Sequence, residues 1–292
     1  MSWLQLEMAL GGLDPRALEE ALNAAGAIAV TFTDAADDPV YEPPPGAEIL
    51  WHETRVTALF DPQEDRAALL AVLSKALAPA SLPPHRFVEL DDRDWAREWL
   101  KDFKPMRFGK RLWVCPTTYD VTEPEAVIVR LDPGLAFGTG SHPTTALCLE
   151  WLDGLAPAGR TLVDYGCGSG VLAIAAALLG ARRVYAVDND PQALLATREN
   201  AERNHVAARI QACAPEDLGT IQADALVANI LARPLVTLAP RFAQLLVPGG
   251  VIALSGVLIE QVNEVAAAYR PHFDLATPVT RDDWARIDGV KR

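Results

Sequence analysis

The sequence lacks several features by which common classes of protein are recognised. Its four cysteines, Cys115, Cys148, Cys167 and Cys213, lie far apart, and no Cys-x-x-Cys pair occurs. That spacing argues against a zinc site or a redox dithiol and fits reduced thiols in the cytoplasm. The start, MSWLQLEMAL, has no basic segment followed by a cleavage site, so we expect no signal peptide. The longest apolar run, VLAIAAALL at 171–179, is too short to span a bilayer, and we expect no membrane association.

Positive charge is also scarce, and the deficit is concentrated at the N-terminus. The 292 residues carry a net charge of −13. Residues 1–92 contain 16 acidic against 5 basic residues, 93–110 contain 3 against 6, and 111–292 contain 20 against 15. An acidic surface repels nucleic-acid phosphates and attracts a basic partner, although it can also serve solubility alone. We therefore expect no direct recognition of nucleic acid. Attraction of a basic partner and a role in solubility alone both stay open.

Residues 1–92 contain the pattern strand, helix, strand twice over. WLQLEMAL alternates like a strand, and a helix follows with Asp14 as N-cap, Pro15 at its first position and Gly26 past its end. AIAVTF and ETRVTALF are the next strands, followed by a helix over PQEDRAALLAVLSKAL and a strand in RFVELDD. This order predicts a ferredoxin-like, split βαβ domain, in which an antiparallel sheet carries its helices on one face. Nothing in this domain has the pattern of a catalytic site.

A short amphipathic helix is expected next, in RDWAREWLKDFK at 93–104. Trp95, Trp99 and Phe103 recur every fourth residue and therefore share one face. Such a face predicts packing against a neighbouring domain, and a hinge is the alternative. We assign residues 93–109 as a linker between two domains.

From residue 110 to 292, strands and helices alternate, which predicts a doubly wound α/β fold with a parallel sheet. Buried strands are expected in TLVDY, RVYAVDND, ADALVANIL and GGVIALSG, each followed by a helical segment. The closing FDLATPVTRDDWARIDGV is typical of a terminal hairpin. Ligands of this fold bind at the carboxyl ends of the strands, so a site is expected in the strand-to-helix turns.

The first of these turns, YGCGSG, predicts a nucleoside site. Its glycines, Gly166, Gly168 and Gly170, allow a tight turn and the close approach of a ligand to the backbone. A dinucleotide fingerprint would need glycine where Val171 stands, and a Walker loop would need Gly-Lys-Ser or Gly-Lys-Thr, which is absent. Asp188, 22 residues beyond Gly166, ends the next strand and can accept hydrogen bonds from both ribose hydroxyls. S-adenosylmethionine, a nucleoside without a pyrophosphate, fits this combination.

Two further stretches belong with this turn. Asn229, in VANILA, ends a later strand at the same edge of the sheet. Its side-chain amide and the following carbonyl can accept hydrogen bonds from an amine and direct the amine lone pair. The stretch LDPGLAFGTGSHPTT, residues 131–145, is a glycine-rich loop with an apolar centre, whereas surface loops are usually polar.

These motifs carry a family resemblance. VDYGCGSG, YAVDND and VANIL, in this order, resemble the class I, seven-stranded S-adenosylmethionine-dependent methyltransferases. LDPGLAFGTGSHPTT ahead of them, together with NILA, resembles the bacterial protein methyltransferase A family, which methylates amino groups of large-subunit ribosomal protein eleven. The resemblance covers almost the whole chain. It implies a Rossmann-like methyltransferase domain at 110–292, a ferredoxin-like substrate-recognition domain at 1–92, S-adenosylmethionine as methyl donor, and a basic ribosomal protein of the large subunit as partner.

The resemblance also implies roles for single residues. The loop at 131–145 would close over the methyl donor and form the channel for the substrate amine. Phe137 and Asn229 are expected beside the reacting groups. His142 is the nearest titratable candidate for a catalytic role, and a hydrogen bond that fixes the loop is its equally weighted alternative. Contacts to S-adenosylmethionine are expected from Thr145, Gly166, Gly168, Asp188 and Asn229, and from Asp164 through water or through the amino group of the methionine part. No metal is required.

One departure from the wider class bears on the substrate. Many amino-methylating relatives have Asn or Asp, two prolines and an aromatic residue, whereas this chain has Asn229-Ile230-Leu231-Ala232. An aromatic residue that would stack on a planar target is missing, which argues against a base or a glutamine amide and favours an aliphatic amine. Three rival functions stay open. A small-molecule amine methyltransferase would not need the acidic first domain, an RNA methyltransferase would want a basic one, and the glycine spacing opposes a nicotinamide oxidoreductase.

Overall fold

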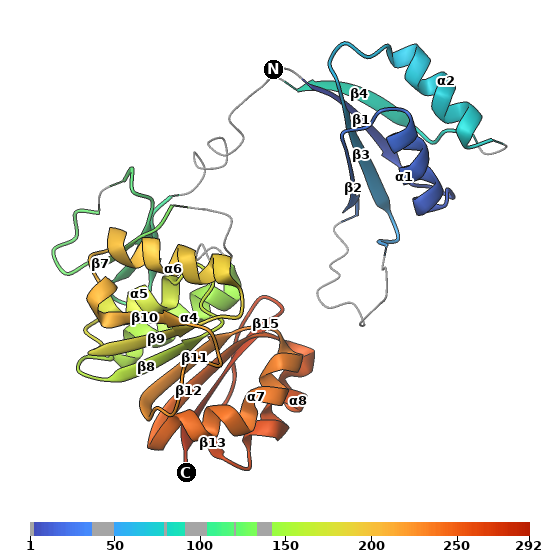
Figure 1. Cartoon of the computed structure of the whole chain (residues 1–292). Coiled ribbons are helices and arrows are strands. Elements are labelled where there is room, and N and C mark those ends of the chain that lie inside the picture. The colour runs from blue at the N-terminus through green and yellow to red at the C-terminus, as the bar shows by residue number, and fades with distance from the viewer. Residues whose placement is uncertain (1–2, 37–49, 79–80, 91–103, 120, 133–141) are drawn as a thin grey trace. The chain divides into compact units, whose positions relative to one another are not determined.

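The structure, a computed structural model, forms two compact units, residues 1–98 and 99–292, which are considered separately (Figure 1). Their boundary falls inside the predicted linker. The described residues are 3–36, 50–78, 81–90, 104–119, 121–132 and 142–292. The predicted aromatic face of the helix at 93–104 and the loop residue Phe137 therefore lie outside the described residues.

Unit 1 is a four-stranded antiparallel sheet with two helices. Its elements are β1 (Trp3–Ala9), α1 (Pro15–Ala24), β2 (Ala29–Asp34), β3 (Thr54–Phe60), α2 (Arg66–Ala76) and β4 (His85–Leu90). The strand order is β2-β3-β1-β4, and each neighbouring pair is antiparallel. This is the split βαβ order that the sequence predicts.

Both helices of unit 1 cover the same face of the sheet, because alternate residues of the central strands are apolar. The core of this face consists of Leu4, Leu6, Met8, Val56, Ala58 and Phe60 from the strands and Leu18, Leu22, Leu69 and Leu73 from the helices. Helix α1 begins as predicted, since Asp14 accepts a hydrogen bond from the Ala17 amide. Helix α2 begins at Arg66 and not at Pro62, because the capping side chain is Asp65, which accepts from the Ala67 amide.

Unit 2 is built around an eight-stranded sheet. Its strands are β8 (Thr161–Tyr165), β9 (Arg183–Val187), β10 (Ile210–Cys213), β11 (Ala223–Asn229), β12 (Leu246–Leu258), β13 (Phe273–Leu275), β14 (Val279–Arg281) and β15 (Trp284–Lys291). Seven of them follow the order β10-β9-β8-β11-β12-β15-β13, and β14 pairs with β15 off this path. The pairs from β10 to β12 are parallel, and β15 is antiparallel to its neighbours. The predicted doubly wound, seven-stranded arrangement is thus present, with β14 as an addition.

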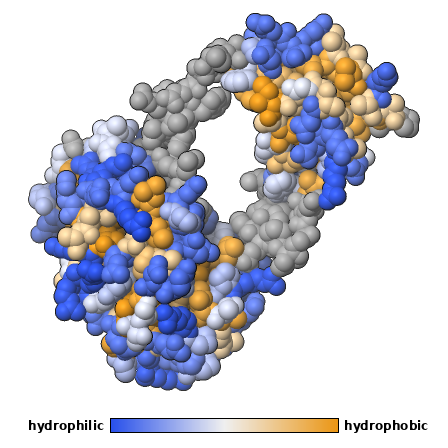
Figure 2. Space-filling view, viewed as in Figure 1, coloured by the Kyte–Doolittle hydropathy of each residue, from blue (hydrophilic) through white to orange (hydrophobic). Residues whose placement is uncertain are grey.

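Helices cover both faces of this sheet. One face packs against α4 (Pro143–Leu155), α5 (Val171–Leu178) and α6 (Pro191–Arg203), and the other against α7 (Ala232–Leu245) and α8 (Val262–Tyr269). Hydrophilic residues predominate on the face of unit 2 that is visible in Figure 2. Within the described ranges, no helix has both the length and the apolar character needed to cross a membrane.

Two parts of unit 2 were missing from the sequence prediction. Strand β10 has only four residues, and β5 (Met106–Phe108), β6 (Leu112–Cys115) and β7 (Val127–Arg130) form a separate three-stranded sheet. Such short strands carry too little alternation to be recognised. Strand β5 lies within the range assigned as linker, 93–109. Helix α4 likewise begins at Pro143, inside the stretch that was predicted to be loop as far as residue 145.

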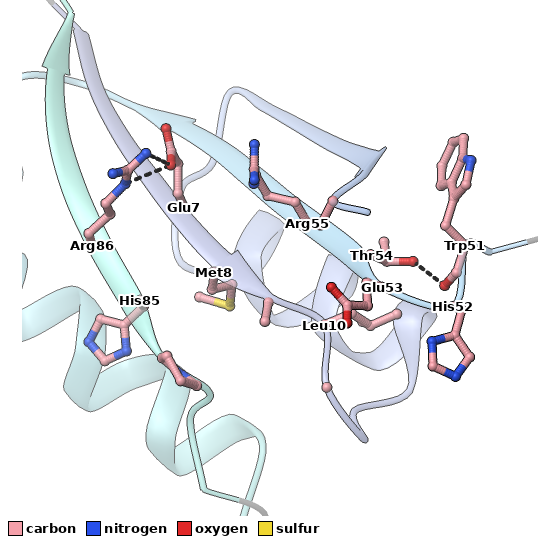
Figure 3. A pocket seen from close by; sticks show the side chains of 14 residues that line it. Glu7, Met8, Leu10, Trp51, His52, Glu53, Thr54, Arg55, His85 and Arg86 are labelled. Atoms are coloured by element: carbon pink, nitrogen blue, oxygen red, sulfur yellow. Dashed lines mark hydrogen bonds and ion pairs between the residues drawn. The ribbon is translucent and has the colours of Figure 1, made fainter. Parts of the chain in front are cut away.

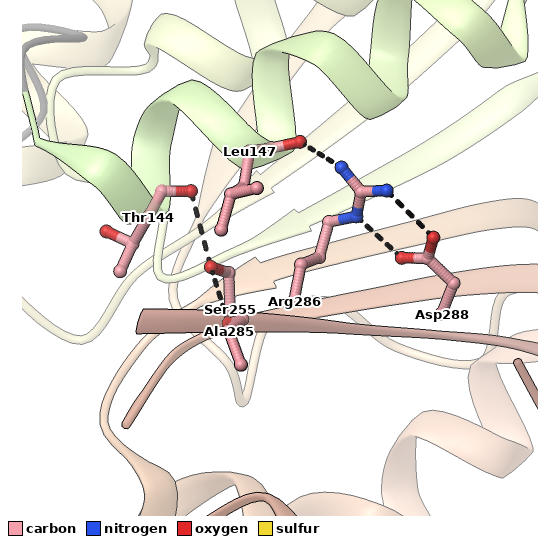
Figure 4. A network of polar contacts seen from close by, with 6 residues as sticks. All are labelled: Thr144, Leu147, Ser255, Ala285, Arg286 and Asp288. Atoms are coloured by element: carbon pink, nitrogen blue, oxygen red, sulfur yellow. Dashed lines mark hydrogen bonds and ion pairs between the residues drawn. The ribbon is translucent and has the colours of Figure 1, made fainter. Parts of the chain in front are cut away.

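A buried arginine, Arg286, on the C-terminal strand β15 pairs with Asp288 of the same strand and connects β15 to α4 (Figure 4). Arg286 is 7% exposed and donates two hydrogen bonds to Asp288, from Nε to Oδ1 at 2.7 Å and from Nη2 to Oδ2 at 2.9 Å. Its remaining nitrogen, Nη1, donates to the carbonyl oxygen of Leu147 in α4. The guanidinium group therefore fixes the second turn of α4 against the sheet.

Replacement of Asp288 by alanine should destabilise unit 2 strongly, because it leaves the Arg286 guanidinium buried without its carboxylate. Removal of one partner of a buried pair costs about 3–5 kcal/mol. We expect the lower end for Asp288→Ala, since the Asp288 side chain is 23% exposed. The free energy of unfolding of unit 2 in urea measures the effect.

Asp274→Ala is the matched control for this prediction. Asp274 also meets an arginine, Arg292, at 2.7 Å, but the two side chains are 73% and 55% exposed. Exposed pairs contribute about 0–1 kcal/mol. Equal losses of stability in the two variants would contradict a structural role for the buried pair.

Candidate cofactor-binding site

The candidate site is a cavity of about 200 Å³ at the carboxyl ends of β8, β9 and β11. It is lined by Thr145, Gly166, Cys167, Gly168, Val171, Leu172, Asp188, Asn189, Asn229 and Ile230. From β8 the sheet continues to β9 on one side and to β11 on the other, so the cavity lies where the strand order reverses. Open α/β sheets bind their ligands at this position.

The glycine-rich turn after β8 needs glycine for two reasons. Gly166 and Gly170 have φ of +82° and +80°, in the left-handed region that side chains disfavour. A Cβ atom on Gly166 would also clash with the side chain of Ile230, and one on Gly170 would lie 2.8 Å from Thr197 Oγ1. The turn therefore packs tightly against the end of β11 on one side and against α6 on the other.

The carboxylate of Asp188 holds the glycine-rich turn by accepting a hydrogen bond from a backbone amide of that turn. Its Oδ2 accepts a hydrogen bond from the Gly168 amide at 2.9 Å, and its Oδ1 accepts one from the Asp190 amide at 3.0 Å. The amides of Gly166 and Cys167 donate to the Val187 carbonyl, at 2.7 and 3.0 Å. These bonds place the Asp188 carboxylate and the glycine turn side by side in the cavity wall, as the spacing in the sequence predicts.

Asp164, at the end of β8, is buried directly behind this turn and is not part of the cavity lining. It is 0% exposed, and its Oδ2 accepts a hydrogen bond from the Ala173 amide in the first turn of α5 at 2.9 Å. Its Oδ1 has no hydrogen-bond partner among the described residues. Burial, with a contribution from the Asp188 charge, raises the pKa of Asp164 from 3.8 to about 7. A contact between Asp164 and a cofactor stays a prediction.

Asn229 and Thr145 are hydrogen-bonded neighbours in the cavity lining. Asn229 ends β11, and its Nδ2 donates a hydrogen bond to Thr145 Oγ1 at 3.2 Å. The sequence predicts Thr145 in a loop, but the structure places it in the first turn of α4. The reason is that Pro143 is well suited to the first position of a helix and that His142 can cap it.

His142 is the N-cap residue of α4. Its Nδ1 lies 2.7 Å from Thr144 Oγ1, and its ring meets that of Trp284 edge-on at 4.9 Å. Burial lowers the pKa of His142 below its ordinary value, which favours the neutral ring. His142 is not among the residues that line the cavity. Of the two roles that the sequence left open, the contacts match the structural one, and a catalytic role stays untested.

A larger cavity, of about 620 Å³, lies in unit 1 at one end of β1, β3 and β4 (Figure 3). Two of its charged groups are paired, since Arg86 Nε donates to Glu7 Oε2 at 2.8 Å, and this bond lowers the pKa of Glu7. The strands at this end are antiparallel, so the carboxyl ends of neighbouring strands do not meet there as they do in a parallel sheet. We therefore place the chemistry in the smaller cavity of unit 2, whose polar groups converge from several elements.

The described part of the chain contains no group of three or more His, Cys, Asp and Glu side chains that could hold a metal ion. Of the ten described residues that line the cavity in unit 2, none is lysine or arginine. A cavity flanked by the carboxylate of Asp188 and lacking basic groups fits a cationic ligand better than a pyrophosphate.

Comparison with known proteins decides the family. The family model described as ribosomal protein L11 methyltransferase (PrmA) matches residues 2–292. The chain belongs to this family. Ribosomal protein L11 methyltransferases of Pseudomonas aeruginosa and Azotobacter vinelandii are each 54% identical to it over 293 aligned positions, covering 100% of this chain and 99% and 100% of theirs. A crystal structure of ribosomal protein L11 methylase from Lactobacillus delbrueckii subsp. bulgaricus superposes with a TM-score of 0.60 at 30% identity, covering 65% of this chain and 100% of that one.

This member of the L11 methyltransferase family has most of the residues predicted for its cofactor site gathered in one place. Thr145, Gly166, Gly168, Asp188 and Asn229 all line one cavity. Sequence reasoning did not single out the apolar lining residues Val171, Leu172 and Ile230 as part of the site. Ile230 follows Asn229 directly, and the other two follow the glycine turn, so adjacency to the motifs was the available signal.

Replacement of Asp188 by alanine should weaken S-adenosylmethionine binding by at least about 10-fold, because the loss of even one charged hydrogen bond costs about 1.5–3 kcal/mol. Isothermal titration calorimetry measures the affinity. Asp190→Ala is the control, since Asp190 is an exposed carboxylate two residues on that caps α6 by accepting from the Gln192 amide. It should leave the affinity unchanged. Unaltered affinity in a folded Asp188→Ala variant would remove Asp188 from the site.

Asp164 should make unit 2 less stable as the pH rises from 4 to 7. Its pKa is about 7 in the folded protein and near 3.8 when unperturbed, so in this interval the folded state binds a proton that the unfolded state has released. Stability falls with pH wherever the folded state binds more protons. A pKa difference of this size corresponds to roughly 4 kcal/mol in total.

The comparison of wild type with Asp164→Asn isolates this effect, because all other titrating groups are shared. Free energies of unfolding measured at pH 4.5 and pH 7.5 should differ more in the wild type than in the variant. The same pH dependence in both proteins would show that Asp164 is ionised throughout that range.

Proposed function

We propose that this protein transfers methyl groups from S-adenosylmethionine to amino groups of ribosomal protein L11, on lysine side chains or at its N-terminus. The observation that carries the proposal is the identity of 54% to L11 methyltransferases over the entire chain. The cavity in unit 2 supports it, since it lies at the position where this fold binds ligands and presents the residues that the motifs predict.

The cavity fits S-adenosylmethionine in the chemistry of its polar groups. Asp188 offers carboxylate oxygens to ribose hydroxyls, and the glycine turn allows a ligand to approach its backbone closely. Asp164 lies behind the turn, and a cationic methionine part of the ligand would favour its ionised form, whose pKa burial otherwise raises. Thr145 and Asn229 line the cavity near the end of β11.

The chemistry assigned to the protein is positioning and desolvation. The bound donor supplies an electrophilic methyl group, whose bond to sulfur breaks as the amine nitrogen bonds to carbon. A lysine amine has an ordinary pKa near 10.4 and must be neutral to attack, and an apolar environment such as that of Leu172 and Ile230 favours the neutral form. The Asn229 amide oxygen can accept a hydrogen bond from the amine and stabilise the positive charge that develops on nitrogen.

Unit 1 is proposed to hold the basic protein substrate. Residues 1–92 carry 16 of the 39 acidic residues of the chain and only 5 of its 26 basic residues. Several of these carboxylates are exposed on α1 and in the segment before α2, among them Glu19, Glu20, Asp61 and Glu64. A negative field of this kind attracts a basic partner and is screened by salt over about 10 Å at 0.1 M.

Incubation with a labelled methyl donor tests the proposal. Full-length enzyme should label purified L11 and leave ribosomal RNA and free lysine unlabelled. A fragment of residues 99–292, which retains both core clusters of unit 2, should bind S-adenosylmethionine normally but lose labelling of L11. Labelling by the full-length enzyme should weaken as salt is raised from 0.05 to 0.5 M, because exposed charges are screened.

The outcomes separate the rival functions. Labelling of free amines in place of L11 would favour a small-molecule methyltransferase, and labelling of the RNA would favour an RNA methyltransferase. A folded fragment that methylates L11 as fast as the whole enzyme, at equal cofactor saturation, would show that unit 1 does not recognise the substrate.

A further inference from the structure

The side-chain amide of Asn229 has two chemically opposite ends, and only one of them suits an amine substrate. The oxygen accepts hydrogen bonds, whereas the NH2 group donates them. An amine whose lone pair must point at a methyl group can offer only its N–H bonds to the protein. Asn229 therefore assists the proposed reaction when its oxygen faces the amine, and a rotation of the amide by half a turn would present the wrong group.

Thr145 engages the donor end of this amide. Asn229 Nδ2 donates to Thr145 Oγ1 at 3.2 Å, across 84 residues of sequence. Thr145 is 1% exposed, and both residues belong to the cavity lining. We propose that Thr145 is a positioning residue for methyl transfer, which takes the NH2 group of Asn229 and so directs the amide oxygen to the substrate amine. This inference rests on the proposed function.

The backbone of Thr145 is held in place from two sides. His142 caps the helix at its start, and the carbonyl oxygen of Thr144 lies 3.3 Å from Ser255 Oγ (Figure 4). One turn further on, Arg286 donates to the carbonyl of Leu147. The first two turns of α4 are thus tied to β12 and β15, so the backbone position from which the Thr145 side chain extends is fixed.

The backbone of Asn229 is held by the same part of β12. The Ile230 amide donates to the carbonyl of Ser255 at 3.2 Å. Gly256 has φ of +82°, and a Cβ atom there would lie 2.8 Å from the carbonyl carbon of Ile230. Ser255, 0% exposed, therefore contacts both segments, through its hydroxyl to α4 and through its carbonyl to the end of β11.

These contacts explain why a threonine suits the position. Its hydroxyl is the acceptor for Asn229, and its branched Cβ restricts the side chain to few rotamers. Valine has nearly the same shape without the hydroxyl, and serine has the hydroxyl without the methyl group. Thr145→Val should therefore free the Asn229 amide to rotate, and Thr145→Ser should largely preserve its orientation.

Nuclear magnetic resonance of the side-chain amides tests the orientation without any substrate. The signal of Asn229 is identified by its loss in Asn229→Ala. In the wild type and in Thr145→Ser its NH2 protons should exchange slowly with solvent, and in Thr145→Val they should exchange at least tenfold faster and shift. Thr144→Val is the matched control, since it removes the neighbouring hydroxyl, which contacts His142 and not Asn229.

Methylation of L11 tests the consequence for the reaction. Thr145→Val should lower kcat about 10- to 100-fold, as misplacement of a reacting group does, and Thr145→Ser should restore it to within about threefold of the wild type. In an Asn229→Ala background the same valine substitution should change kcat less than about twofold, because a residue that acts through Asn229 has nothing left to position.

The outcomes distinguish the two claims. An unchanged Asn229 signal in Thr145→Val overturns the positioning role, whatever the activity. Additive losses in the double variant overturn it as well, since Thr145 would then act on cofactor or substrate by itself. A wild-type enzyme that fails to methylate L11 overturns the proposed function, while the amide signal still decides the orientation.

Discussion

The meeting of strand ends at the point where the sheet order reverses is the constraint on which the site depends. Strands β8, β9 and β11 are parallel neighbours, so their carboxyl ends lie at one edge. The chain continues from β8 to β9 on one side and returns to β11 on the other, which leaves a gap above β8 that no crossover helix fills. Gly166, Asp188 and Asn229 come together there only because each directly follows or ends one of these strands.

The electrostatics of this edge work against stability of the ligand-free protein. Asp164 is wholly buried, one of its oxygens has no partner in the described part of the chain, and its pKa is raised to about 7. Asp188 adds a second carboxylate close by. Two carboxylates in such a place disfavour each other, and a cationic ligand relieves both. Functional sites commonly lower the stability of the folded protein in this way, because the groups that bind the ligand are unfavourable without it.

Rigidity at the other side of the cavity comes from elements far from the glycine turn. Helix α4 is fixed by Ser255 and by the Arg286–Asp288 pair, and the end of β11 is fixed by Ser255 and Gly256. The antiparallel C-terminal strand β15 thus contributes to the geometry of the site without lining the cavity.

Local patterns determined a large part of this description. The strand order of unit 1, the alternation in unit 2, the glycine turn, Asp188 and Asn229 were all predicted, because strand periodicity, capping residues and glycine depend on neighbours within a few positions. The short strands β5, β6, β7 and β10 were missed because three or four residues carry no readable period. The start of α4 at Pro143 was missed because the glycines and the proline that precede it are typical of a loop.

Only the tertiary structure decided how distant residues meet. His142 caps helix α4, and the carboxylate of Asp164 is buried away from water. Thr145 accepts a hydrogen bond from the Asn229 amide, 84 residues away in the sequence. No local pattern encodes such pairings, since burial and hydrogen-bond partners depend on which strands and helices pack together. The sequence thus determined which groups stand at the ends of the strands, and the packing of α4 against β12 and β15 decided which way those groups face.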